Sequence, residues 1–388
     1  MRASQRRAVG LTAAVAVAVL AVPATAGAAT PKCDGVKATI VGTNGDDNLL
    51  GGGRSDVIVA KGGNDTIRGV RGDDVICADD GADLVRSGSG DDYIDAGADG
   101  AEIIAGAGDD EITGEFDGPG GPETQEVDLG DGSDNMTGAV ANNIEVVADQ
   151  GADHVILEIA ATGRIFGMDG DDILYLVPLN PSAGGAVVGK AGDDELGAAG
   201  GLYGGDGDDL AIGFGFDFID TGAGADDIAA GGGSDYIDSR DGDDFIDTGP
   251  ANGLDQVFAR GGDDVIVGGG IIEAGDGDDR FEATSESAQP AFVSGGSGVD
   301  KLFAGDDFGD ELLGEDGGDL LDGAGGNDYL DGGEGEDRIF AGPGDDGLFG
   351  FSGDDLLFGD VGDDYCNGGT GTDELFPFDT CETEDNIP

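Results

Sequence analysis

The sequence predicts an all-β solenoid built from short strands and turns, with two nine-residue repeats in each coil. A nine-residue motif, G-G-x-G-x-D-x-U-x, where U is apolar, recurs about 25 times. Its glycines permit positive φ and tight turns, so the first six residues form a loop. Its last three residues alternate outward, inward and outward as a strand, which places one apolar side chain per repeat in a core.

The first element is a signal peptide over residues 1–28. Arg2, Arg6 and Arg7 precede an apolar run at 8–22, and small residues at 24–28 offer a cleavage site. This order is typical of secretory signals, so we expect a secreted, extracellular protein. The apolar run of about 15 residues is too short to span a bilayer, and no later segment could span one. Residues 29–41 then form an N-terminal cap.

A regular block of eight repeats follows at 42–113. Two of its loops depart from the pattern, because Arg54 replaces a glycine of the second repeat and Ala101 replaces the aspartate of the seventh. We expect these loops to bind metal poorly. The residues predicted to face inward are Leu49, Ile58, Ile67, Ile76, Val85, Ile94, Ile103 and Ile112.

The register breaks repeatedly between 114 and 220. Insertions separate single good copies at 167 and 189, and the stretch 138–165 has apolar runs but few ligand loops. We expect coils there that continue the solenoid without metal. A second repeat block covers 221–376, interrupted near 248, 268, 283 and 304 and regular from Gly314, and residues 377–388 form a C-terminal cap tail. About 25 repeats, two per coil and about 4.8 Å between coils, give a rod roughly 60 Å long.

The aspartate at position 6 is the candidate metal ligand. Two repeats make one coil, so each such aspartate lies over the one two repeats later, and carboxylates so close repel unless a cation lies between them. Carboxylates with backbone carbonyls form the oxygen-rich ligand set that Ca²⁺ prefers. Its neighbour at position 5 is interpreted as solvated. The predicted ligands are Asp47, Asp56, Asp65, Asp74, Asp83, Asp92, Asp110, Asp217, Asp226, Asp235, Asp244, Asp264, Asp319, Asp328, Asp337, Asp346, Asp355, Asp364 and Asp373.

These repeats resemble the RTX (haemolysin-type) calcium-binding repeat family. Seven copies run without a slip from GEDGGDLLD at 314 to GGTGTDELF at 368, and the resemblance covers nearly the whole chain after residue 28. It implies a right-handed parallel β-roll with multiple Ca²⁺ ions held between stacked loops. It does not imply an enzyme, because catalysis in that family usually belongs to a separate domain.

The charge balance narrows the class of partner. The chain has 84 acidic and 17 basic residues, a formal net charge of −67. Nucleic acids and anionic membrane surfaces are therefore excluded as partners. Such acidity usually indicates disorder, but here it is periodic, so we expect calcium binding to be part of folding.

Four cysteines in an exported chain indicate two disulfides, for which three pairings exist. Cys33 precedes the first repeat, Cys77 ends the fourth, Cys366 occupies an inward position and Cys381 lies in the tail. We predict Cys33–Cys77 and Cys366–Cys381, each tying a terminal segment over an open end of the solenoid.

Three functions fit the sequence. The first is a calcium-binding structural or interaction protein without enzymatic activity. The second is a module that binds extracellular polysaccharide or a cell surface. The third is a polysaccharide hydrolase or lyase built on residues 114–220, for which paired carboxylates would serve as acid and base. His154, the only histidine, is interpreted as a surface residue, and the aromatics Phe214, Phe216 and Phe218 as packing around a broken coil.

Overall fold

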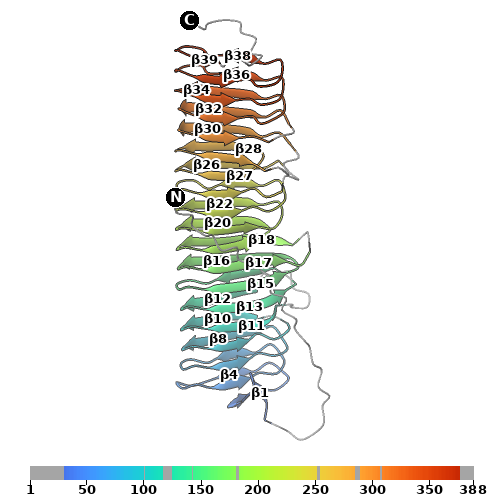
Figure 1. Cartoon of the computed structure of the whole chain (residues 1–388). Coiled ribbons are helices and arrows are strands. Elements are labelled where there is room, and N and C mark those ends of the chain that lie inside the picture. Colours follow the sequence, from blue (N-terminus) through green and yellow to red (C-terminus); the bar gives the residue numbers. More distant parts are fainter. Residues whose placement is uncertain are drawn as a thin grey trace.

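The computed structural model describes residues 30–99, 101–116, 125–141, 143–180, 183–250, 254–284, 289–305 and 308–375. Within these ranges the ordered elements are β-strands, and no helix could cross a membrane. Figure 1 shows the strands stacked as one straight column, with β4 near one end and β38 and β39 at the other. The predicted signal peptide and the predicted C-terminal tail lie outside the described residues.

Two parallel sheets form the column, and the chain alternates between them. The even-numbered sheet consists of β4 (Asn48–Leu50), β6 (Thr66–Arg68), β8 (Asp83–Ser89), β10 (Ala101–Ala107), β12 (Gln125–Asp131), β14 (Ile144–Val147), β16 (Thr162–Asp169), β18 (Gly184–Ala191), β20 (Gly200–Asp206), β22 (Phe218–Ala223), β24 (Tyr236–Asp238), β26 (Gln256–Gly261), β28 (Ile271–Asp276), β30 (Phe292–Gly298), β32 (Glu311–Gly317), β34 (Tyr329–Glu334), β36 (Gly347–Phe349) and β38 (Tyr365–Asn367).

The odd-numbered sheet has one strand more. It consists of β3 (Ile40–Val41), β5 (Val57–Val59), β7 (Val75–Cys77), β9 (Tyr93–Asp95), β11 (Glu111–Phe116), β13 (Asn135–Val140), β15 (His154–Ile159), β17 (Ile173–Pro178), β19 (Glu195–Ala198), β21 (Leu210–Gly213), β23 (Asp227–Ala229), β25 (Phe245–Asp247), β27 (Val265–Gly268), β29 (Arg280–Ala283), β31 (Lys301–Phe303), β33 (Leu320–Asp322), β35 (Arg338–Phe340), β37 (Leu356–Phe358) and β39 (Glu374–Leu375).

Each strand pairs in parallel with the strand two further along the chain. In the N-terminal block the paired residues are two repeats apart in the sequence, as in Ile58 with Ile76, so the predicted coil of two repeats is confirmed. The result is a parallel β-solenoid of about 17 turns. At about 4.8 Å per turn it is ~80 Å long. The length predicted from the sequence was too short, because it counted only the well-formed repeats and left out the coils between them.

The core lies between the two sheets and takes one apolar side chain per strand. All eight residues predicted to face inward in the N-terminal block are buried. The core continues through the irregular middle, where the odd-numbered sheet contributes the buried side chains of Met136, Val155, Leu174 and Leu196. The insertions therefore interrupt the sequence pattern without interrupting the core.

The insertions all fall on one of the two edges. From an even-numbered strand to the next odd-numbered strand, successive inward residues are nine apart in every coil from Leu49→Ile58 to Leu348→Leu357. From an odd-numbered strand to the next even-numbered strand, the spacing varies from six (Leu196→Leu202) to 15 (Ile112→Val127). We call the edge formed by the first set of turns the constant edge, and the other the variable edge.

The N-terminal segment is a small hairpin held by a disulfide. Strands β1 (Lys32–Cys33) and β2 (Val36–Lys37) pair antiparallel, and Cys33 bonds to Cys77 with Cα atoms 5.6 Å apart, as predicted. Cys33 packs with Val59 and Cys77, whose side chains point away from the core. The bridge thus fastens the hairpin to the outer side of the first coils. Cys366 is buried at its predicted inward position, whereas Cys381 lies outside the described residues.

Candidate metal sites

Aspartates form an unbroken ladder along the constant edge, half-buried at Asp56 and buried from Asp74 to Asp373. Each immediately precedes an odd-numbered strand, and its backbone N–H donates to Oδ1 of the corresponding aspartate in the next coil, at 2.7–3.1 Å. The ladder contains Asp56, Asp74, Asp92, Asp110, Asp134, Asp153, Asp172, Asp194, Asp209, Asp226, Asp244, Asp264, Asp279, Asp300, Asp319, Asp337, Asp355 and Asp373.

The variable edge carries the same ladder in three separate pieces. The pieces are separated by two gaps, in which the coils have no aspartate at the ladder position. The long gap runs from Ala101 to Gly200, and the second contains Gly270 and Ala291. The three pieces are Asp47–Asp65–Asp83, Asp217–Asp235–Asp255 and Asp310–Asp328–Asp346–Asp364.

The structure brings the sequence-predicted pairs together in neighbouring coils. Eleven of the 19 predicted ligands lie on the constant edge, from Asp56 to Asp373, and eight lie on the variable edge, from Asp47 to Asp364. Asp83 has no aspartate in the following coil, because Ala101 lies there, as expected for the weakened seventh repeat. Their role as ligands stays a prediction.

Sequence reasoning missed nine aspartates in equivalent positions. It required a partner two regular repeats away, and lengthened or shortened turns on the variable edge change the sequence separation to between 15 and 24 without changing the coil. The invariant spacing across the constant edge would have found seven of them. We expected the coils at 138–165 to lack metal. The structure places a buried ladder aspartate there, Asp153, in the same position as the predicted ligands. The nine are Asp134, Asp153, Asp172, Asp194, Asp209, Asp255, Asp279, Asp300 and Asp310.

The second carboxylate oxygen of most ladder aspartates is buried without a partner. In Asp110, Asp134 and Asp319, Oδ1 accepts the backbone N–H of the preceding coil, while Oδ2 has no hydrogen-bond donor among the described residues. Burial of an unpaired carboxylate oxygen is costly, so these atoms require a cation or a proton.

Glycine at position 1 leaves space beside that oxygen. A Cβ on Gly314 would fall against Oδ2 of Asp319 and the carbonyl oxygen of Gly332 in the next coil. Glycine at position 4 instead allows successive loops to stack closely. Gly335 has a φ of +146°, and a Cβ there would collide with the carbonyl oxygen of Gly317 in the preceding coil. The loop therefore encloses a small space bordered by carboxylate and carbonyl oxygens.

The ligand chemistry of this space fits calcium. Among the described residues there is no group of three or more His, Cys, Asp or Glu side chains suited to a metal. An ion between the coils would therefore draw most of its ligands from backbone carbonyls and the two neighbouring aspartates. Oxygen-only, carbonyl-rich coordination suits Ca²⁺ and disfavours zinc.

The burial of these carboxyl groups raises their pKa. Desolvation raises the pKa of Asp110 to about 7 and those of Asp134 and Asp264 to about 8, against a backbone hydrogen bond that lowers each. Neighbouring ladder aspartates raise the pKa further by charge repulsion. Near neutral pH these three carboxyl groups therefore hold protons in the metal-free chain.

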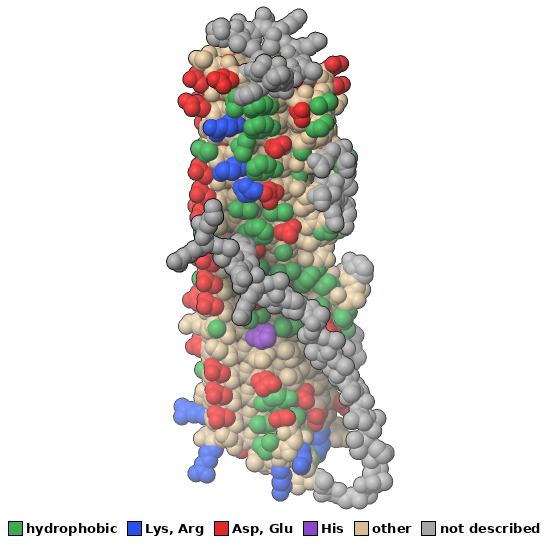
Figure 2. Space-filling model, viewed as in Figure 1, with side chains coloured by type: hydrophobic (Ala, Val, Ile, Leu, Met, Phe, Trp, Pro, Cys, Tyr) green, Lys and Arg blue, Asp and Glu red, His purple; other side chains and the backbone are tan. Residues whose placement is uncertain are grey.

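The position-5 aspartates are exposed, as expected, yet they form a ladder of their own. The backbone N–H of Ser133 donates to Oδ1 of Asp109 in the preceding coil at 3.0 Å, and Asp193 donates in the same way to Asp171. Figure 2 shows acidic side chains in a row along much of one edge. The two neighbours in each Gly-Asp-Asp turn thus have opposite environments.

A family model described as the RTX calcium-binding nonapeptide repeat, in four copies, matches residues 41–76, 70–100, 101–117, 212–246, 251–270, 313–348 and 340–375. Together these segments cover about half of the chain. The chain belongs to the RTX calcium-binding repeat family. No curated protein matches it. The RTX matches leave out residues 118–211, where the variable edge has lost its aspartates while the constant edge keeps them.

Proposed function

We propose that this protein is a secreted, non-enzymatic structural rod whose coils are fastened to one another by Ca²⁺ and which folds when the ions bind. The observation that carries the proposal is the constant-edge ladder, in which buried aspartates repeat in every coil from Asp74 to Asp373 with one carboxylate oxygen left without a donor among the described residues. The proposed ligands are the ladder aspartates of both edges, together with the carbonyls of their loops.

Electrostatics supports the coupling of folding to metal binding. The formal net charge is −67, and the ladders concentrate buried carboxylates one coil apart. Repulsion between such groups opposes the compact state, and a divalent cation between each pair reverses the sign of the interaction. Ion binding then supplies free energy that the small core alone does not.

Circular dichroism and small-angle scattering test the proposal. The chain in a chelator at pH 8 should be expanded with little β-structure, and millimolar Ca²⁺ should convert it to a rod ~80 Å long. Mg²⁺ at the same concentration serves as the control, since it demands a tighter octahedral site and keeps its waters. Identical spectra and scattering in chelator and in Ca²⁺ would contradict the proposal.

A further inference from the structure

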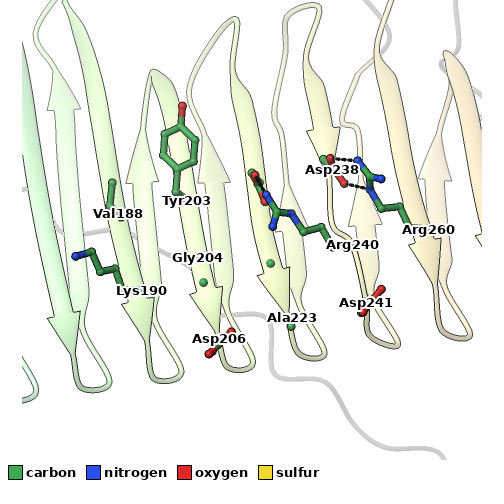
Figure 3. A pocket seen from close by; sticks show the side chains of 13 residues that line it. Val188, Lys190, Tyr203, Gly204, Asp206, Ala223, Asp238, Arg240, Asp241 and Arg260 are labelled. Carbon is green, nitrogen blue, oxygen red and sulfur yellow. Dashed lines mark hydrogen bonds and ion pairs between the residues drawn. The ribbon is translucent and has the colours of Figure 1, made fainter.

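An open groove of about 700 Å³ lies on the outer face of the even-numbered sheet, over strands β18 to β26. Lys190, Arg240 and Arg260 line it, three of only 17 basic residues in the chain. Figure 3 shows these side chains on separate coils, with Tyr203 beside them. Basic groups and an aromatic ring are thus concentrated in one groove of a very acidic chain. This groove is distinct from the aspartate ladders, so we consider a second function for it.

Four aromatic rings follow one another along the solenoid axis on this face, with ring centroids 5.7 Å apart for Tyr203–Phe218, 5.0 Å for Phe218–Tyr236 and 5.3 Å for Tyr236–Phe258. Phe218 and Tyr236 are paired in register, whereas Tyr203 and Phe258 share the register of the carboxylates Asp220 and Asp238. The basic residues line the groove beside them. The face therefore offers one ring per coil beside a band of polar groups.

Ion pairs hold the polar band in place. Arg260 donates through Nε and a terminal nitrogen to the two oxygens of Asp238, and Arg240 pairs with Asp220. The side chains of Arg240 and Arg260 remain 53% and 55% exposed, so their other N–H groups face the groove. Lys190 Nζ lies 2.8 Å from Sδ of Met168. The groups are thus oriented before any ligand arrives, which reduces the entropy cost of binding.

A sugar polymer matches this arrangement. A pyranose ring has an apolar C–H face that packs on an aromatic ring, and hydroxyl groups that hydrogen-bond to carboxylates and guanidinium groups. Tyr203 and Phe218 are 37% and 41% exposed, so their rings can be covered by a ligand. Rings at one-coil intervals favour an extended chain along the axis over a single small molecule.

The charges of the groove favour an uncharged polymer. The arginines are already paired, and the four aspartates that line the groove outnumber its three basic residues. An anionic polymer would meet no excess positive charge here, and the rest of the chain would repel it. We propose that this face binds a neutral polysaccharide laid along the solenoid axis over Tyr203, Phe218, Tyr236 and Phe258.

The C-terminal block supplies a matched control. Tyr329, Phe349 and Tyr365 form a second set of neighbouring rings on the same sheet, with centroids 5.0 Å and 5.6 Å apart. The groove beside them is lined by Glu315, Asp316 and other residues, none of which has a basic side chain. A change in this second set alters an outer aromatic contact without touching the proposed site.

Affinity electrophoresis in saturating Ca²⁺ tests the site with neutral β-glucan, xylan and mannan, and with the anionic polymers alginate and polygalacturonate. The unchanged protein should be retarded by at least one neutral polymer. Phe218→Ala and Arg240→Ala should each weaken that binding about tenfold or more, and Phe349→Ala should leave it unchanged. Circular dichroism in Ca²⁺ keeps failure of the site separate from failure of the calcium-dependent fold.

Three results would overturn the proposal. They are no retardation by any neutral polymer while the protein is folded in Ca²⁺, retardation by the anionic polymers alone, and an equal loss in Phe218→Ala and Phe349→Ala. Should Phe218→Ala fail to fold, Arg240→Ala provides the same comparison from the polar residues that line the groove.

Discussion

At the residue scale, the two carboxylates of each Gly-Asp-Asp turn differ in burial and in hydrogen bonding. Asp171 is exposed and accepts an N–H from the following coil, whereas Asp172 is buried, accepts an N–H from the preceding coil and keeps one oxygen unpartnered. The difference in burial follows from the extended backbone that leads into the strand at Ile173. Consecutive side chains there point to opposite sides, so Asp171 faces solvent and Asp172 faces inward. Only the buried member is placed to bind an ion between coils.

Asp172→Asn should therefore reduce calcium binding, although residue 172 lies outside the segments that match the family. The amide keeps the size of the side chain but removes the charge that attracts the ion. We expect isothermal titration calorimetry to show a loss of about one or two ions, because an aspartate between two coils borders two sites. Asp171→Asn is the control and should keep the full stoichiometry. Equal stoichiometry in both variants would contradict the assignment.

Protons should partly replace calcium in the metal-free chain. Desolvation raises the folded-state pKa of Asp83 from 3.8 to about 6, that of Asp110 to about 7 and that of Asp134 to about 8. As the pH falls the folded chain takes up protons that the unfolded chain does not, so protonation stabilises the fold. That stabilisation is complete below about pH 4 and is lost as the pH rises through 6 to 8.

We thus expect metal-free protein to gain β-structure when the pH is lowered from 8 to about 5, as followed by circular dichroism. With Ca²⁺ present the signal should change little over the same range, while the calcium affinity should rise with pH as protons leave the ladder. A metal-free spectrum that stays unfolded throughout the titration would show that burial of these carboxyls does not control folding.

At the scale of the strand and turn, the two edges differ in what they tolerate. Inward side chains are always nine apart across the constant edge, whereas the variable edge accepts spacings between six and 15. The constant edge carries the complete ladder, and an extra residue there would displace an aspartate from its neighbours. The need to keep the ladder aspartates stacked accounts for a spacing that varies at only one edge.

A pair of insertions tests this difference. Gly-Ser inserted between Gly249 and Pro250, on the variable edge, should change the thermal midpoint of the calcium-loaded protein little. The same insertion between Gly242 and Asp243, on the constant edge, should lower it by several degrees or more, because it separates Asp244 from Asp226 and Asp264 in the ladder. Differential scanning calorimetry would make the comparison. Equal shifts in the two variants would contradict the division into edges.

The sequence predicted the coil, the inward residues of the N-terminal block and the Cys33–Cys77 bridge. The first two follow from a spacing that does not vary, and the bridge follows from the positions of Cys33 before the first repeat and Cys77 at the end of the fourth. It did not predict Asp134 or Asp209 as ladder members, since their partners lie 24 and 17 residues away across insertions. It also interpreted Phe218 as packing around a broken coil. The stacking of Phe218 on Tyr236 depends on two successive strands of one sheet sharing an outer face, which a linear pattern does not reveal.

At the scale of the whole molecule, the constant-edge ladder joins coils that the sequence divides into regular blocks at 42–113 and 221–376 and an irregular middle. In a solenoid each coil contacts only its neighbours, so the stability of the rod depends on every junction. A middle without metal would act as a weak junction and let the two blocks fold separately. A ladder continuous from Asp56 to Asp373 should instead transmit folding along the whole rod.

Calcium titration followed by circular dichroism should accordingly give one cooperative transition in the unchanged protein, because the middle coils bind ions together with both blocks. The double variant Asp153→Asn, Asp172→Asn removes two adjacent ladder charges from the irregular middle and should split that transition in two. It should also expose residues 114–220 to limited proteolysis in Ca²⁺. The double variant Asp171→Asn, Asp193→Asn, which changes exposed position-5 residues of the same region, is the control and should keep a single transition. Two transitions in the unchanged protein would mean that the middle coils do not couple the blocks, and that the ladder is a feature of geometry without a role in folding.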